Sequence, residues 1–214
     1  MKALLFPAIF FTSVLSFTQC TGQSNNTYQL KEGDIVLQKI PCGGLCDAII
    51  ETTPCARDRM FNHCGIVHFD GNRAYVIEAI GKQVQQNPLD SFLKRESGAK
   101  TLYVARLKPQ YASYIEPAVR KATIYLGTPY DDAFVPGDDA LYCSELVYKV
   151  YKKDNTPNLF PLAPMTFKSK SGKTFPAWTA YYKDIKHDIP EGEPGINPCA
   201  IANSSAVTLL TIQR

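Results

Sequence analysis

The sequence predicts an α+β fold, a small antiparallel sheet packed against a few helices in one domain. Two runs of strand-like composition, 63–69 and 73–80, flank the turn residues Asp70-Gly71-Asn72, which is a strong hairpin signal. Two helical segments follow, one from Glu116 and one from Ala140. The 214 residues, 45% of them hydrophobic, suit a single domain with a substantial core.

The remaining elements have local signals of their own. A glycine turn opens the first strand, and Pro117 takes the first position of a helix that stops at Gly127. We expect, in chain order, a strand at 33–38, a short helix at 45–51, strands at 63–69 and 73–80, the end of that sheet region at 84–87, a turn into a short helix at 88–93, a strand at 101–107, helices at 116–127 and 140–153, and a Pro- and Gly-rich tail from 157 that wraps the surface and returns as a strand at 207–212.

The charge balance excludes two classes of partner. Charged residues make up 20% of the chain, the net charge is +3, and the basic residues form no long run. Neither nucleic acid nor an anionic membrane surface is therefore expected to bind.

The N-terminus is expected to direct export. Residues 1–20 open with Lys2 and continue as an apolar stretch too short to span a bilayer, which is typical of a signal peptide. Cys20 lies where a bacterial lipoprotein is cut and acylated, although Phe17 and Gln19 depart from the small residues usual there, so ordinary secretion stays open. Residues 21–29 form a polar tether before the domain at 30–214. We expect a location in the cell envelope, periplasmic or membrane-tethered through Cys20.

Cysteines other than Cys20 and Cys143 are candidates for disulfides, because export leads to an oxidising compartment. There are five of them, so at least one stays free or pairs elsewhere: Cys42, Cys46, Cys55, Cys64 and Cys199. The alternative is a zinc site in the segment from Cys42 to Cys64. Its spacing matches no common zinc pattern, so we expect no metal.

The hairpin brings His63 and Glu78 to one face of the sheet. A loop at Asp70-Gly71 sets the two residues directly opposite each other, and a loop at Gly71-Asn72 makes them diagonal neighbours. A carboxylate among the apolar residues around Glu78 is costly to bury unless it is paired. His68 has the opposite parity, so we expect His63 to be the histidine that Glu78 orients.

The helix from Ala140 presents Cys143 on its buried face, together with Leu146, Val147 and Val150. Asp138 and Asp139 precede the helix as candidate N-caps. A thiol at a helix N-terminus is favoured as the thiolate, and the free amides there can stabilise an oxyanion. The alternative is that Cys143 is a small buried apolar residue.

Two neighbours of Cys143 are expected to have structural roles. Glu145 lies off the apolar face and four residues before Lys149, which predicts a surface ion pair. Ser144 is expected to serve packing or helix geometry.

Five motifs in this order resemble the YiiX/YebB-like family of permuted papain-like cysteine hydrolases, a branch of the NlpC-type superfamily. They are Gly33-Asp34-Ile35-Val36, His63-Cys64-Gly65-Ile66-Val67, Val76-Ile77-Glu78-Ala79, Leu126-Gly127-Thr128-Pro129-Tyr130-Asp131 and Tyr142-Cys143-Ser144-Glu145-Leu146. The order histidine, glutamate, cysteine is the one that circular permutation gives. The resemblance implies a permuted papain-like fold, with a small sheet or barrel against helices.

The resemblance also implies roles for individual residues. Cys143 would be the nucleophile, His63 the general base and then acid, and Glu78 the orienting residue, with Tyr130 lining the cleft and no cofactor needed. The substrate would be an amide- or acyl-containing molecule of the cell envelope. Cleavage of a peptide or peptidoglycan-related amide through a thioester is expected; the alternatives are a lipid-directed acyl hydrolase or acyltransferase, and a non-catalytic binding protein.

Overall fold

The structure is a computed structural model that describes residues 29–213 apart from 42, 54, 56–58, 97, 138, 155 and 157. The predicted signal peptide, most of the tether, Cys20, Cys42 and Asp138 therefore lie outside the described residues. Within the described residues, no helix combines the length and the apolar character that crossing a membrane requires.

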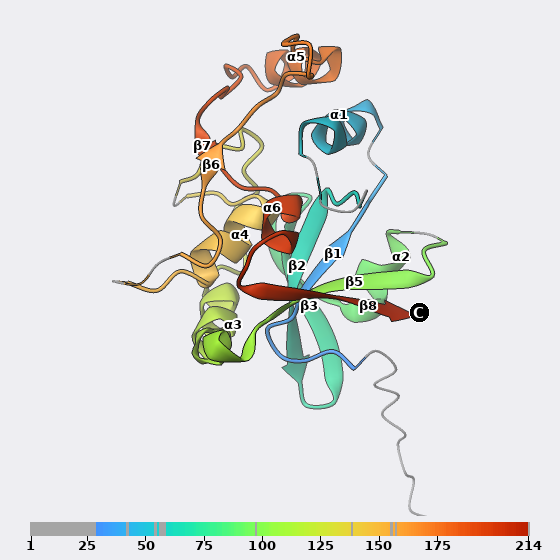
Figure 1. Ribbon diagram of the computed structural model, residues 1–214, viewed down its shortest axis with the longest axis vertical. Coiled ribbons are helices and arrows are strands. Elements are labelled where there is room, and N and C mark those ends of the chain that lie inside the picture. The colour runs from blue at the N-terminus through green and yellow to red at the C-terminus, as the bar shows by residue number, and fades with distance from the viewer. Residues whose placement is uncertain are drawn as a thin grey trace, which may run out of the picture.

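The molecule is built on a six-stranded antiparallel sheet in the order β4-β3-β2-β1-β5-β8 (Figure 1). The strands are β1 (Ile35–Gln38), β2 (His63–Asp70), β3 (Arg73–Ile80), β4 (Gln83–Pro88), β5 (Thr101–Leu107) and β8 (Val207–Gln213). Strands β4 and β8 are its two edges and do not pair with each other within the described chain, so the sheet is open. This confirms the predicted α+β fold with an antiparallel sheet.

Helices cover both faces of the sheet. They are α1 (Gly44–Thr52), α2 (Leu89–Lys94), the 3₁₀ helix η2 (Pro109–Tyr114), α3 (Ile115–Ile124), α4 (Cys143–Val150), α5 (Pro176–Asp184) and α6 (Pro198–Ala202). Helices α3 and α4 pack on one face of β2, whereas α2 packs against β3 and β4. The larger hydrophobic core lies between the sheet and α3, α4 and α6, and a smaller one lies under α2.

The hairpin of β2 and β3 turns through Gly71-Asn72, because Asp70 pairs with Arg73. This is the second of the two registers predicted from the sequence. Central strands β1, β2 and β3 are buried along most of their length, as their β-branched and aromatic content favours.

Helix α4 differs from its prediction at both ends. It begins at Cys143 rather than 140 and ends at Val150, and its N-cap is Tyr142 in an extended conformation, so Asp139 does not cap it. Backbone hydrogen bonds explain the late start: Leu141 N–H donates to the carbonyl of Pro129, and Asp131 N–H donates to the carbonyl of Leu141. These bonds hold the residues before the helix in an extended segment.

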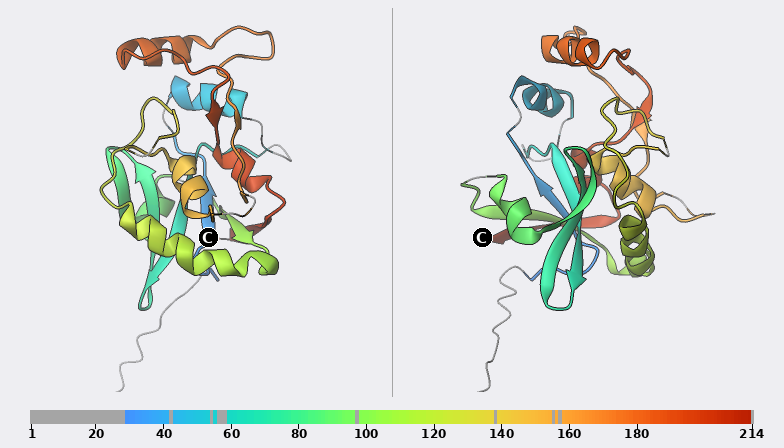
Figure 2. Two further views of the ribbon diagram at one scale, coloured as in Figure 1. Left: turned by 90° about the vertical axis from the view of Figure 1, so that its left-hand side faces the viewer. Right: turned by 180° about the vertical axis from the view of Figure 1, so that it is seen from behind.

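The tail from 157 does more than wrap the surface. It contains α5, α6 and a short ribbon of β6 (Ala163–Pro164) and β7 (Pro194–Gly195). Helix α5 lies against α1 at the end of the molecule opposite the β2–β3 turn (Figures 1 and 2). Phe167, Trp178 and Tyr182 form an aromatic cluster with Ala48 there. The sequence did not predict the packing of α5 on α1, because the aromatic residues of this cluster are spread between two Pro-rich segments.

Candidate active site

The site begins where β2 starts and β3 ends. His63 is the first residue of β2, and its Nε2 atom lies 2.5 Å from Oε2 of Glu78 on β3. Both side chains are buried, with 3% of His63 and none of Glu78 exposed. The structure thus places these two residues on one face, as diagonal neighbours in the observed register.

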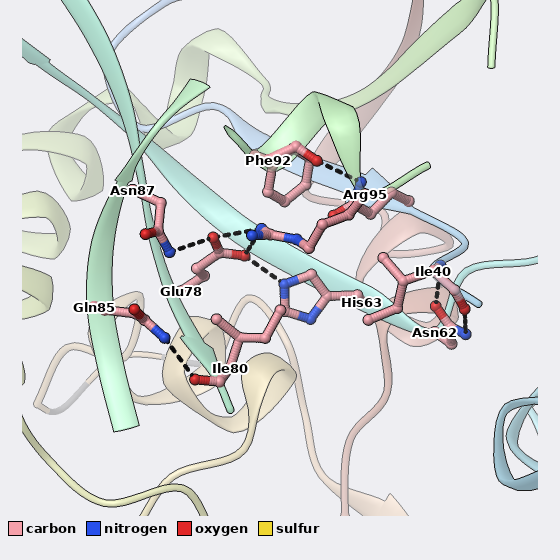
Figure 3. Close-up of polar contacts among 10 residues, drawn as sticks. Ile40, Asn62, His63, Glu78, Ile80, Gln85, Asn87, Phe92 and Arg95 are labelled. Carbon is pink, nitrogen blue, oxygen red and sulfur yellow. Dashed lines mark hydrogen bonds and ion pairs between the residues drawn. The ribbon is translucent and has the colours of Figure 1, made fainter. Parts of the chain in front are cut away.

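Glu78 has two further partners, which are drawn in Figure 3. The guanidinium of Arg95 donates to both carboxylate oxygens at 2.5 Å, and Asn87 Nδ2 donates to Oε1 at 2.9 Å. Burial alone would raise the pKa of Glu78, but His63, Arg95 and Asn87 outweigh it and the pKa is lowered. Sequence reasoning missed both partners, because no motif connects α2 or β4 with the hairpin.

Cys143 is the first residue of α4 and carries a free thiol with 6% of the residue exposed. It interacts with the side chains of His63 and Cys64 and with the backbone of Cys64. The thiol of Cys64 is the largest influence, and together with His63 it holds the pKa of Cys143 well below its ordinary value despite burial.

Cys64 is a second free thiol, whereas the sequence analysis considered it as a disulfide partner or as part of the alternative zinc site. Successive residues on a strand point to opposite faces, so Cys64 lies in the core under α4 while His63 faces Glu78. Burial and the neighbouring Cys143 raise the pKa of Cys64 well above its ordinary value. These opposite directions, and the place of Cys143 at the start of a helix, favour ionisation of Cys143, with Cys64 as its neutral neighbour.

His63 completes the arrangement. Burial opposes its protonation, but hydrogen bonding to Cys143 and to Glu78 prevails and raises the pKa of His63 to about 9. Because Nε2 is held by Glu78, the other ring nitrogen is left for contacts on the thiol side. A thiol beside an imidazole that a carboxylate orients can form a thiolate–imidazolium pair, the form that attacks carbonyl carbon.

Glu145 forms the predicted ion pair with Lys149, but its position corrects the expectation that this pair lies on the surface. It is fully buried, and its Oε1 accepts the backbone N–H of Gly137 at 3.0 Å, while Lys149 lies 3.8 Å away. The loop before α4 folds over this side of the helix and covers the carboxylate. Ser144 is buried too, and it donates to the carbonyl of Ile196 at 2.9 Å, which joins α4 to the tail.

A pocket of about 180 Å³ opens onto Cys143. Tyr130 lines it, as Cys143 does, and Phe134, Tyr142 and Trp178 add further aromatic rings. The other lining residues are apolar or uncharged polar: Ile49, Thr52, Thr53, Asn62, Ser144, Pro161, Ala163, Pro164, Met165, Thr166, Phe167, Gly195, Ile196, Asn197, Pro198 and Ala200. More than half of these lining residues come from the tail, whose contribution the sequence did not reveal.

Disulfides hold the segment that leads into β2. Cys55 is bonded to Cys199 on α6, and Cys46 is also disulfide-bonded. These bonds take two of the thiolates that the alternative zinc site between Cys42 and Cys64 would need. Asn62, just before His63, donates to Cys46 Sγ and bonds both backbone polar groups of Ile40.

The fold and these residues define a papain-like class of protein in which the histidine strand precedes the cysteine helix. A sequence model of the family described as "permuted papain-like amidase enzyme, YaeF/YiiX, C92 family" matches residues 29–211. The chain belongs to this family of cysteine amidases and peptidases, which confirms the resemblance found in the sequence.

Individual relatives agree with this assignment. The chain is 34% identical over 127 residues to the uncharacterized protein YiiX of Escherichia coli K12, a match that covers 58% of this chain and 59% of that protein. The crystal structure titled metalloprotein yiiX from Escherichia coli O157:H7 superposes with a TM-score of 0.70 at 24% identity, covering 86% of this chain and 97% of the other. At that identity the superposition shows the fold.

Proposed function

We propose that the protein is a cysteine hydrolase that cleaves an amide bond with Cys143 as nucleophile, His63 as general base and acid, and Glu78 as the residue that orients His63. The observation that carries the proposal is the 2.5 Å contact between His63 Nε2 and a buried Glu78, together with the interaction between His63 and the free thiol of Cys143. Membership of an amidase family supports the reaction class.

The proposed reaction has two halves. The thiolate of Cys143 attacks the amide carbonyl, and the imidazolium of His63 gives its proton to the departing amine, which leaves a thioester. His63 then takes a proton from water, the hydroxide attacks the thioester, and the acid and the thiolate are released. The first-turn amides of α4 lie where they can stabilise the oxyanion of both tetrahedral intermediates.

The test needs no known substrate. The rate at which iodoacetamide alkylates Cys143, followed by mass spectrometry across pH, reports the pKa of the thiol. The wild type should give a midpoint well below the ordinary value of about 8.5, and His63→Ala should raise it. His68→Ala is the matched control. His68 lies away from this site, and its Nδ1 atom is 2.8 Å from Oε1 of Glu32. A thiol that iodoacetamide does not alkylate, or whose alkylation midpoint is unchanged in His63→Ala, would refute the proposal.

A second candidate function concerns the acyl group. Among the described residues that line the pocket, none is Asp, Glu, Lys, Arg or His, so the lining offers no ion pair to the carboxylates of a peptidoglycan stem peptide. An apolar, aromatic-lined pocket beside the nucleophile instead favours an uncharged apolar acyl group. This supports a lipid-directed acyl hydrolase or acyltransferase over a peptidoglycan peptidase.

The two substrate classes can be separated with p-nitroanilides. Turnover should rise from acetyl to dodecanoyl p-nitroanilide and be slow with γ-glutamyl p-nitroanilide. Ala163→Trp, at an exposed position on the pocket wall, should lower turnover of the dodecanoyl compound more than that of the acetyl one. Thr208→Trp, at an exposed position on β8, is the control. A preference for the glutamyl compound would restore the peptidoglycan proposal.

We also propose that the chain is exported. Disulfides at Cys46 and between Cys55 and Cys199 support an oxidising compartment. A palmitate analogue should label the wild type and not Cys20→Ala if the tether is a lipid anchor.

The related E. coli structure is titled a metalloprotein. In the described part of this chain, no three His, Cys, Asp or Glu side chains are grouped so that they could hold a metal ion, so we derive no step through a metal.

A further inference from the structure

Arg95 lies at the end of α2, outside every motif that the sequence analysis identified. It is the C-cap of the helix, and its backbone N–H donates to the carbonyl of Phe92 at 3.3 Å. Its guanidinium carbon lies 5.2 Å from the centre of the Phe92 ring. Since Phe92 is itself buried in the core under α2, the Arg95 side chain is held along a fixed wall.

The carboxylate of Glu78 is the target of that side chain. A single guanidinium nitrogen of Arg95, Nη2, donates to both of its oxygens at 2.5 Å, which holds the carboxylate against the guanidinium charge. His63 approaches one oxygen and Asn87 the other (Figure 3). The three donors come from α2, β2 and β4, and they leave the carboxylate no freedom to turn away from His63.

Burial makes the charge of Arg95 necessary. Glu78 is fully buried, and a carboxylate without a partner in such a place takes up a proton instead of staying ionised. The imidazole of His63 is a cation only while it is protonated, and it loses that proton during the proposed reaction. A guanidinium is charged at every pH at which the protein is folded, so only Arg95 gives Glu78 a permanent counter-ion.

The charges of the site then balance. In the thiolate–imidazolium state, Cys143 and Glu78 are negative and His63 and Arg95 are positive. Without Arg95 the same buried state would carry one excess negative charge, and proton uptake at each of the other three groups would become more favourable.

We propose that Arg95 is a positioning residue that keeps Glu78 ionised and aligned with His63 at every step of the cycle. The inference rests on the proposed function, because it gives Arg95 a role through Glu78 and His63. Arg95 is not among the described residues that line the pocket, and its side-chain hydrogen bonds go to Glu78, so we assign its contribution to the reaction through the carboxylate.

The test is the titration of the three histidines by NMR of the full chain carrying ¹³C-labelled histidine. Removing a positive charge raises the pKa of His63, so Arg95→Met should move its midpoint upward by about one unit, while His68 and His187 stay in place as internal references. Arg95→Gln, which keeps a donor but no charge, should give the same shift. Arg95→Lys, which keeps the charge but not the guanidinium, should leave the midpoint near the wild-type value.

Alkylation of Cys143 by iodoacetamide provides the second readout in the same variants. The midpoint for thiolate formation should also rise by about one unit in Arg95→Met and Arg95→Gln, a tenfold loss of thiolate on the acid limb. Arg120→Met is the control, because Arg120 is exposed and pairs with Glu116 on α3. Unchanged midpoints in both uncharged variants, with an effect of His63→Ala intact, would overturn the role of Arg95 alone. If His63→Ala leaves the alkylation midpoint unchanged, the proposed function itself is overturned.

Discussion

His63 contacts Glu78 across a position that has no side chain. The register of β2 and β3 pairs Ile66 with Ile77, so the residue facing Glu78 is Gly65 rather than His63. A Cβ atom on Gly65 would lie 3.0 Å from the Cβ of Glu78 and would overlap a methyl group of Val76. The diagonal contact therefore depends on the glycine that follows Cys64.

Gly65→Ala is expected to disturb this contact without changing any charged group. The added methyl group must displace Glu78 or Val76, both on a central strand with little room to move. We expect a fall in the free energy of unfolding of about 1–3 kcal/mol, measured by urea titration, and a lower pKa of His63 in NMR titration. Full stability with an unchanged His63 titration would show that the strand adjusts freely.

Glu78→Gln should act on His63 in the opposite direction to the Arg95 variants. The amide keeps the shape of the carboxylate but loses the negative charge that stabilises the imidazolium in the wild type. The pKa of His63, raised to about 9 in the wild type, should fall, and turnover should drop by roughly 100-fold or more. NMR titration and the rate with an acyl p-nitroanilide measure the two effects. A normal rate would remove Glu78 from the mechanism.

Cys64→Ala tests the second thiol. Cys64 is the largest influence that lowers the pKa of Cys143, so its removal should raise the alkylation midpoint of Cys143. Cys64→Ser retains a hydroxyl donor in the same place and should restore most of the wild-type behaviour. Equal midpoints in all three proteins would mean that Cys64 only fills space in the core.

Glu145→Gln tests the pH dependence of stability. Burial raises the pKa of Glu145 to about 7, above the value of about 4.3 in an unfolded chain. A raised carboxyl pKa adds stability below the unfolded value, and this stability is lost as pH rises through 7. The urea midpoint of the wild type should therefore decline between pH 5 and pH 8 more steeply than that of the variant. Parallel curves would contradict the assignment.

The sequence was enough to bring His63 and Glu78 together, because strand parity is a local property that survives either hairpin register. It also placed Cys143 on the buried face of its helix. It could not place Glu145, because helical periodicity reports one apolar stripe and says nothing about a loop folding over the other side. Arg95 was invisible for a similar reason: α2 reaches Glu78 through tertiary packing, 17 residues along the chain.

The contribution of the tail to the pocket wall could not be predicted, for a different reason. The tail contributes to this wall through α5, α6 and the ribbon of β6 and β7, which are elements of two to nine residues, and α5 packs on α1 and α6 on α4. Short elements of this kind carry little periodicity of their own. Tyr130, Phe134 and Trp178 all line the pocket, but only Tyr130 belongs to a motif that the sequence analysis identified.

The bond between Cys55 and Cys199 imposes an order on biosynthesis. Its two partners are separated by 144 residues, and the thiols of Cys64 and Cys143 emerge between them. Cys55 must therefore wait, reduced or transiently mispaired, until almost the whole chain has been made. Cys64 is buried in the core and Cys143 is buried at the start of α4, so both intervening thiols are shielded from thiol–disulfide exchange once the helix has packed. Packing of the cysteine helix therefore favours correct pairing of Cys55 with Cys199.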